Sequence, residues 1–391
     1  MLKKLYYQRY LKVLCAMILL ILGIYLYSGY LSVNTWHHFA NSYQQNDSTL
    51  RADFDAHPDQ FTYWDEQQER DRPYRNFQKF QKANLSVYQS SLGATPSASE
   101  YNANYLYYTN TSTGITELCL LIVPLAGFLL FFIDHKTGFT RWLFSLAVTR
   151  SQIFWQKIIY LAGPFLASVL LGQLLYALIL FMGIPQPYMN ATLTQLIVSA
   201  LSNFILLVTY FSAGALIGSL VGNLVLGPLT LIVFCYLTFA LPTAITTTLD
   251  LFNNSVLRQT STTFFIETIG KTGGHWYSNL LFICLSGLLL CLASHAFKKI
   301  SFDYDGEYLL NPSTRFPIWL VMSSYSTFIL LNALIRPWQL YLYQTAENPV
   351  SLSYALGATI LTTLIITLIC GSLVFSTPLK RIWLQYRKKR Q

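Results

Sequence analysis

The chain of 391 residues is 53% hydrophobic and only 11% charged, and its charges crowd into gaps between long stretches that carry none. A soluble globular protein usually carries about 25% charged residues, and disorder requires low hydrophobicity, so both classes are excluded for most of the chain. The net charge of +9 fits a membrane protein, because Lys and Arg are in excess in cytoplasmic loops. It does not indicate nucleic-acid binding, because no basic stripe lies on a soluble domain.

Eight apolar stretches predict an all-α, polytopic membrane protein, since about 20 apolar residues cross the hydrocarbon core. The first, residues 11–30, follows a basic tail and is predicted to be an uncleaved anchor, because the run is long and no A-x-A site follows it. The other predicted spans are residues 115–133, 158–182, 195–220, 224–244, 278–297, 317–335 and 354–375. Only three residues separate the fourth span from the fifth, which predicts an antiparallel helical hairpin.

Residues 34–114 between the first two spans are polar and rich in aromatic side chains. Within this segment, residues 74–92 place apolar side chains at helical spacing. We therefore expect a small, mostly helical extracellular domain here.

The distribution of basic residues predicts the topology. Four segments hold 17 of the 26 Lys and Arg residues but only 4 of the 17 acidic residues, so they are predicted to be cytoplasmic. Both termini then lie inside, in agreement with an even number of spans. The chain divides into a tail and first span (1–33), the extracellular domain (34–114), a core of spans two to six (115–297) with a cytoplasmic segment at 134–157, and a final part (298–391) with spans seven and eight and a basic tail.

One helix-packing motif stands out. Gly214, Gly218 and Gly222 form G-x-x-x-G-x-x-x-G in the fourth span. This spacing places three glycines on one helix face, so that a second helix can approach closely.

Catalytic, metal-binding and nucleotide-binding motifs are not recognisable. The six cysteines lie in apolar stretches without a CxxC pair, and the His and Asp residues of 37–59 follow no known ligand spacing. The sequence at 269–272 ends like a phosphate-binding loop, but Phe265 replaces the required first glycine. His135 and His295 are interpreted as interfacial residues at the ends of spans.

The segment Asp134 to Ile159 resembles the first cytoplasmic segment of the permeases of type-2 ABC exporters in bacteria. That family has a basic residue, a G-T pair, a leucine-rich L-P-x-S-R run and a lysine before the next span. The similar positions here are Lys136, Gly138, Thr140, Leu143, Leu146, Arg150 and Lys157. The sequence departs from the pattern at His135, where glutamate is common, at Phe139 inside the G-T pair, and at 147–149 in the proline–serine region. A second stretch, 302–319, resembles a G-E-x-L-L segment of some permeases.

This resemblance implies that the chain is the membrane-spanning permease subunit of an exporter in the plasma membrane, paired with a second permease copy or a similar subunit. A separate ABC-type ATPase would bind ATP and Mg, and this chain would hold no cofactor. A short amphipathic segment would dock on the ATPase and transmit its motion. We expect that role for Gly138, Thr140, Arg141, Trp142, Leu143, Leu146, Arg150, Phe154 and Lys157.

Three alternatives stay open. The segment 140–157 also fits a plain interfacial helix lying against lipid headgroups. The chain could instead be a sensing or resistance module whose extracellular domain binds an antimicrobial peptide or an envelope lipid. A membrane-embedded transferase is disfavoured, because it would need His, Asp or Glu clustered at one membrane face.

Overall fold

The structure, a computed structural model, describes residues 2–65, 70–89, 107–108, 115–256, 276–304, 306–342 and 350–376. Within these ranges seven helical segments are long and apolar enough to cross a membrane, so the chain is an all-α, multi-pass membrane protein. The phosphate-loop echo at 269–272 and the basic tail at 377–391 lie outside the described residues.

Seven of the eight predicted spans coincide with these helices. The exception is the fifth, where α10 (Leu226–Val256) has an apolar part, Leu226–Leu241, that is shorter than 18 residues. At about 1.5 Å per residue such a stretch falls short of a hydrocarbon core of about 30 Å. The helix continues into a threonine-rich stretch that ends the hydrophobic run.

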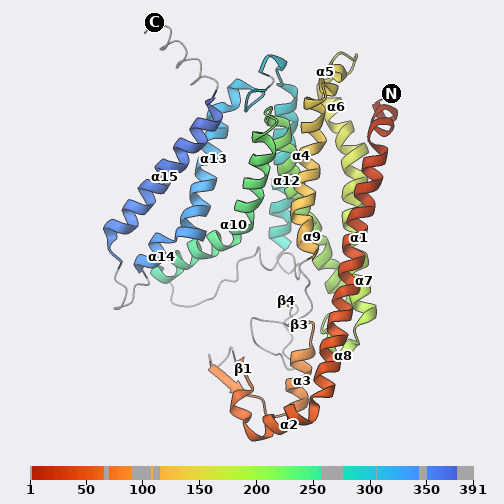
Figure 1. Ribbon diagram of the computed structural model, residues 1–391, viewed down its shortest axis with the longest axis vertical. Helices are drawn as coiled ribbons and strands as arrows, with labels where there is room; N and C mark the ends of the chain where they lie inside the picture. Colours follow the sequence, from red (N-terminus) through yellow and green to blue (C-terminus); the bar gives the residue numbers. More distant parts are fainter. Residues whose placement is uncertain are drawn as a thin grey trace. The chain divides into compact units, whose positions relative to one another are not determined.

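The chain forms two compact units, and spans contribute to both. The first comprises Met1–Ile122, Gln156–Thr209 and Phe265–Leu285; the second comprises Val123–Trp155, Tyr210–Phe264 and Ser286–Gln391. Figure 1 gives the element labels used below.

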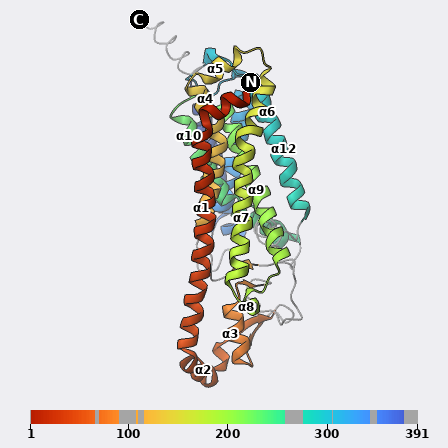
Figure 2. The same cartoon turned by 90° about the vertical axis from the view of Figure 1, so that its right-hand side faces the viewer.

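In the first unit, α1 (Leu2–Gln45) and α7 (Gly163–Gly183) run side by side (Figures 1 and 2). Gly172 of α7 faces the ring of Tyr25, and a Cβ at that position would overlap the ring. The two helices are also joined by a hydrogen bond of 3.1 Å from Gln173 Nε2 to the Tyr25 hydroxyl. Small residues and interhelical hydrogen bonds are the usual means of packing helices in lipid, where the hydrophobic effect gives no driving force between them.

The first helix is longer than predicted, because it continues from residue 30 to Gln45. The added turns contain neither Gly nor Pro, and Trp36 and Ala40 are buried in a core that includes Leu85 and Met189. The Trp36 indole N–H also donates to the Leu85 carbonyl at 2.8 Å. Tertiary packing therefore extends the helix beyond the apolar run that marks the span.

The polar region between the first two long helices is built from short elements. They are α2 (Asp47–Ala56), η1 (Pro58–Gln60), an antiparallel pair β1 (Thr62–Asp65) and β2 (Arg70–Pro73), α3 (Phe77–Leu85), and a second antiparallel pair β3 (Tyr88–Gln89) and β4 (Tyr107–Tyr108). The predicted helix at 74–92 is thus shorter than expected. It ends where the Val87 N–H donates to the carbonyl of Tyr188 in α8 (Gln186–Met189).

Aromatic side chains form the core of this polar region. Phe54, Phe61 and Phe80 lie with ring centroids 4.9–5.9 Å apart, and Phe77 packs on Phe54 at 5.5 Å. Such edge and tilted contacts are the favoured geometry of aromatic pairs. These rings hold the short elements together.

In the second unit, α4 (Cys119–Lys136) packs closely on α9 (Leu193–Leu220). A Cβ on Gly214 would overlap the carbonyl oxygen of Pro124, and one on Gly218 would overlap that of Phe128. From the other side, Gly127 of α4 faces the carbonyl of Phe211 in the same way. The backbones therefore touch at a crossing where no larger residue fits.

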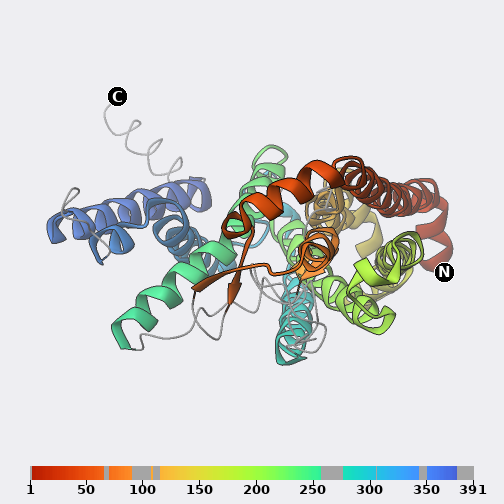
Figure 3. The same cartoon turned by 90° about the horizontal axis from the view of Figure 1, so that it is seen from below.

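The second unit also contains α10, the part of α12 (Trp276–Lys298) from Ser286 onward, α13 (Arg315–Ile329), the π-helical turn η6 (Leu330–Ile335), α14 (Pro337–Leu342) and α15 (Leu352–Val374). Of these, α13 and α15 lie side by side, as the blue helices of Figure 3 show. Thr238 of α10 and Tyr325 of α13 share a hydrogen bond of 2.8 Å between their hydroxyl groups.

Candidate functional site: the end of the second unit

The segment that carries the family resemblance forms two short helices joined by an irregular turn. A glycine starts the first one: Gly138 has φ +70°, a left-handed conformation that other residues adopt at a cost. Next come α5 (Phe139–Phe144), an irregular stretch at 145–149, and α6 (Arg150–Lys157). The π-helical turn η3 (Ile158–Ala162) then leads into α7.

The nine residues singled out in this segment divide into an inner and an outer set. Thr140, Leu143, Phe154 and Lys157 are almost fully buried, between 0% and 1% exposed. Gly138, Arg141, Trp142 and Arg150 are exposed, and Leu146 is half-buried. The inner set therefore fixes the segment to the protein, and only the outer set is available to another molecule.

A cluster of phenylalanine rings anchors α5 and α6. Phe154 stacks on Phe131 of α4 at 4.8 Å and lies 5.8 Å from Phe297 of α12. Phe144 of α5 meets the same Phe297 ring edge-on at 5.3 Å. Three helices thus converge on one ring, so α5 and α6 cannot shift without disturbing α12.

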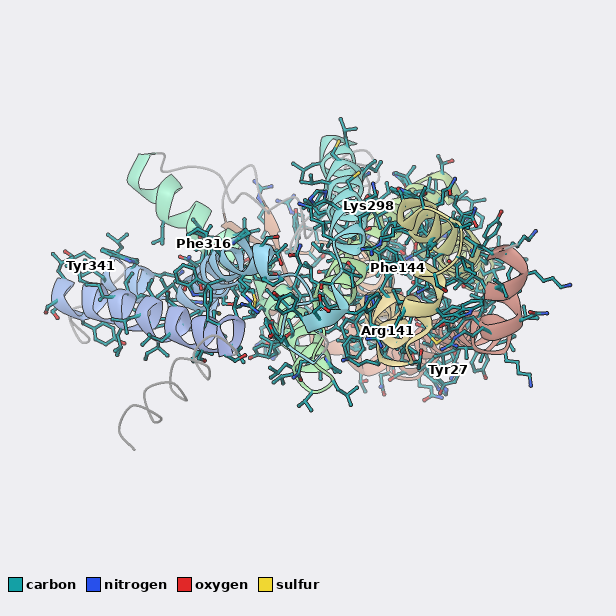
Figure 4. All side chains as sticks on the ribbon, turned by 90° about the horizontal axis from the view of Figure 1, so that it is seen from above. Tyr27, Arg141, Phe144, Lys298, Phe316 and Tyr341 are labelled. Carbon is teal, nitrogen blue, oxygen red and sulfur yellow. The ribbon has the colours of Figure 1, made fainter. Side chains whose placement is uncertain are left out.

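Arg150 adds a polar tie between the same elements. Its Nη1 donates to the carbonyl oxygens of Lys298, at 2.8 Å, and Ile300, at 3.1 Å. Its guanidinium also lies 4.3 Å from the centre of the Phe144 ring. The last carbonyls of a helix lack intrahelical partners and carry partial negative charge, so a cation that donates to them stabilises the helix end. Figure 4 shows Arg141, Phe144 and Lys298 at this end of the unit.

The stretch that follows α12 folds over the connection between α9 and α10. We call residues 302–315 the strap; its resolved elements are η4 (Phe302–Tyr304) and η5 (Pro312–Thr314). The Gly222 N–H donates to the Tyr308 carbonyl, and the Leu310 N–H donates to the Leu220 carbonyl, both at 3.0 Å. These two bonds form a β-bridge between Val221 and Leu309.

Side chains reinforce the strap. Glu307 forms an ion pair with Arg315, and both side chains are mostly buried. The Asn223 amide donates to the Gly306 carbonyl at 3.1 Å, next to a left-handed turn at Gly306 (φ +89°). Arg141 of α5 lies 5.1 Å from the Phe302 ring. The strap is therefore in contact with both the α9–α10 turn and α5.

Tyr308 anchors the strap to α10. Its ring is buried, and its hydroxyl is 3.0 Å from the Thr230 hydroxyl of α10. Burial raises the pKa of the Tyr308 phenol, because the charged phenolate would be poorly solvated, and the hydrogen bond with Thr230 partly offsets the shift. The phenol is neutral at physiological pH and serves as a hydrogen-bonding anchor.

The predicted packing residue Gly222 belongs to this strap rather than to the α4–α9 crossing. A Cβ there would come within 3.0 Å of the Glu307 carbonyl oxygen and crowd the Leu310 side chain. The three glycines of the motif thus serve two contacts: Gly214 and Gly218 admit α4, and Gly222 admits the strap.

The sequence did not predict the hydrogen bonds of Arg150 to the end of α12, and it assigned no role to Glu307, Arg315 or Tyr308. The signal for Glu307 and Tyr308 is the G-E-x-L-L pattern at 306–310, which contains both residues. The two histidines differ in solvent exposure: His135 is buried beside Phe297, whereas His295 is exposed. Within the described ranges, no three His, Cys, Asp or Glu side chains are grouped to hold a metal.

No protein-family model, curated protein or solved structure matches this chain. The features that bear on its function are therefore those of the site itself: two short helices anchored inward by aromatic rings, an arginine that closes the end of α12, and a strap over the α9–α10 turn.

Proposed function

We propose that this chain is the membrane-spanning permease subunit of an ATP-driven ABC exporter in the plasma membrane. A separate ABC-type ATPase binds ATP and Mg and docks on the α5–α6 segment. The observation that carries the proposal is the form of that segment: two short helices that follow α4, held from inside by Leu143 and Phe154, with Arg141 and Trp142 exposed. A docking element must be rigidly attached and must also present side chains to its partner.

Charge supports the cytoplasmic side for this end of the unit. Arg141, Arg150, Lys298 and Lys299 gather around α5, α6 and the end of α12, and basic residues are concentrated on the cytoplasmic side of membrane proteins. By the sequence-based topology, the region of α2, α3 and the small sheets, which lies between the first two spans, is extracellular.

The contacts of the site suggest a route by which ATPase motion reaches the spans. Force applied to α5 acts on α12 through Phe144 and Arg150, and on the α9–α10 turn through the strap. A second permease copy or a similar subunit completes the transporter, and the substrate moves between the two subunits. The sensing or resistance alternative differs in one respect: there the extracellular region binds the ligand, and ATP use releases it.

Co-purification tests the proposal. The tagged chain is extracted from its native cell in mild detergent, and the proteins that elute with it are identified. We expect a stoichiometric ABC-type ATPase that is lost in Trp142→Ala and Leu146→Asp. Leu342→Asp is the matched control, since Leu342 of α14 is exposed and lies outside the site; it keeps the ATPase.

Two results would count against the proposal: an ATPase that is absent under several detergents, or one lost equally in the control. Binding of a peptide or envelope lipid to the chain without any associated ATPase would favour the sensing alternative. Arg150→Glu is unsuitable for this test, because it also breaks the tie to α12.

A further inference from the structure

The membrane span formed by α13 and η6 ends at an arginine with an unusual backbone conformation. Arg336 has φ +49°, in the left-handed region, which bulky residues seldom adopt because Cβ is crowded there. Its N–H donates to the Leu331 carbonyl at 2.9 Å, which closes the π-helical turn, and Pro337 begins α14 directly after it. Such a conformation persists only where the surroundings impose it, and it is concentrated at functional sites.

The guanidinium of Arg336 uses only one of its nitrogens within the protein. Its Nε donates to the Ala333 carbonyl at 2.9 Å, which fixes the side chain against the last turn of the span. Within the described ranges, Nη1 and Nη2 form no hydrogen bond and no ion pair. Arg315, at the other end of α13, differs because it is paired with Glu307. Arg336 is half-exposed, so its two terminal nitrogens are available to an anion.

The position of Arg336 along the span places it at the depth of the lipid headgroups. The helical segment Pro312–Ile335 has 24 residues, and at about 1.5 Å per residue it is longer than a hydrocarbon core of about 30 Å. Arg336 follows it directly. Trp338 and Tyr341 of α14 are in edge contact, with ring centroids 6.4 Å apart, and both residue types are enriched at the membrane–water interface.

Apolar side chains that face lipid lie on both sides of the arginine. Leu334 precedes it, Leu340 and Leu342 follow it, and all three are exposed. The short helix that carries the last two packs beside α15 and α10, so it is held in place. The cation is therefore bordered by surface suited to acyl chains, which a phospholipid has and a free anion lacks.

We propose that Arg336 binds the phosphate of a phospholipid headgroup, with its two terminal nitrogens donating to phosphate oxygens. The planar guanidinium matches the geometry of phosphate in this way. One arginine is sufficient for the site, and Trp338 and Tyr341 hold α14 at the depth where the phosphates lie. All these residues belong to the second unit, and the site depends neither on the function of the chain nor on an ATPase.

Photocrosslinking from one position tests the site without interference from lipids bound elsewhere. The full chain with Leu340→p-benzoylphenylalanine is placed in bilayers that contain equal amounts of phosphatidylglycerol and glucosyl diacylglycerol with the same acyl chains. Mass spectrometry of the crosslinked peptide gives the ratio of the two lipids beside Arg336. The glucosyl lipid has no phosphate, so we expect phosphatidylglycerol to exceed it several-fold.

Variants of the crosslinking chain separate the phosphate contact from other effects. Arg336→Gln should lower the ratio about fivefold, the contribution of one basic residue near anionic lipid. Arg336→Lys should lower it less, because an ammonium attracts phosphate as a point charge but lacks the guanidinium fork. Arg75→Gln removes an exposed charge that lies next to α3 and should leave the ratio unchanged.

Several outcomes would overturn the proposal. Equal crosslinking of the two lipids with Arg336 present would exclude a phosphate site, as would a ratio that Arg336→Gln leaves unchanged. An equal fall of the ratio in Arg75→Gln would mean that only net charge matters. If excess inorganic phosphate removed the preference, and chloride of the same ionic strength did not, the site would be one for small anions.

Discussion

Arg150 and Lys298 are 148 positions apart in the sequence, yet the guanidinium of the first donates to the backbone carbonyl of the second at 2.8 Å. The arginine thereby caps the carboxyl end of α12, where the last carbonyl groups have no intrahelical N–H donor. It also connects the segment proposed to receive force to a helix of the membrane domain.

We predict that Arg150→Gln lowers the free energy of unfolding by about 1–2 kcal/mol, since hydrogen bonds from a charged donor are lost at an exposed site. Arg150→Lys should lower the free energy of unfolding by less than Arg150→Gln does, because the charge remains. It should still lie below the wild type, because an ammonium cannot reproduce the planar contact with Phe144. Equilibrium unfolding by SDS in mixed micelles measures both. Lys299→Gln removes a neighbouring exposed charge and should change stability by less than about 0.5 kcal/mol; a similar loss there would refute the role given to Arg150.

Substitution of the glycines at the α4–α9 crossing should destabilise the protein, unlike substitution of helix glycines that face open space. Gly214→Ala and Gly218→Ala each force a methyl group onto a carbonyl oxygen of α4, and we expect a loss of about 1–3 kcal/mol. Gly287→Ala and Gly357→Ala place the methyl in open space and should be neutral or stabilising by up to about 1 kcal/mol. The same unfolding assay decides, and equal effects at all four positions would contradict the close crossing.

The ion pair of the strap should be revealed by a double-mutant cycle. Glu307→Gln leaves the mostly buried Arg315 without its carboxylate, and we expect a loss of about 2 kcal/mol. Once both residues are changed to Gln, the second change should cost clearly less than it does alone, with a coupling energy of about 1 kcal/mol. Additive losses in the cycle would mean that the two side chains act independently.

Tyr308→Phe should lower stability by about 1 kcal/mol near neutral pH through loss of the Thr230 hydrogen bond. The difference between wild type and variant should depend on pH. Burial raises the pKa of the phenol in the folded chain, whereas the unfolded chain ionises near the ordinary value of about 10. The wild-type advantage is therefore complete below pH of about 10 and is lost as pH rises through the folded pKa. A difference that stays constant from pH 7 to 11 would rule out this account.

The membrane spans were predictable from composition, because burial in lipid imposes a length and an apolar content that show directly in the sequence. The close approach at Gly214 and Gly218 followed from spacing alone. The continuation of α1 to Gln45 did not, because it depends on Trp36 packing against residues more than forty positions away. Local composition carries no signal for such a contact.

For the α5–α6 segment, too, some features were predictable from the sequence and others depend on tertiary contacts. Its position and its amphipathic character were predictable, but which apolar residues turn inward was not, since that depends on where Phe131 and Phe297 lie. Arg150 illustrates the limit most clearly. Its hydrogen bonds to the backbone carbonyls of Lys298 and Ile300 depend on a residue almost 150 positions away, so the sequence of the segment carries no signal for them.

The strap has a consequence for the order in which the chain is assembled during synthesis. The turn between α9 and α10 emerges from the ribosome about 85 residues before the stretch at 306–310 that completes its backbone hydrogen bonds. The hairpin must therefore wait in the membrane with the Gly222 N–H and the Leu220 carbonyl satisfied by water, until α12 has been inserted. A nascent chain arrested before residue 306 should thus hold this hairpin in an open, water-accessible form, and the release of α12 would act as its closing step.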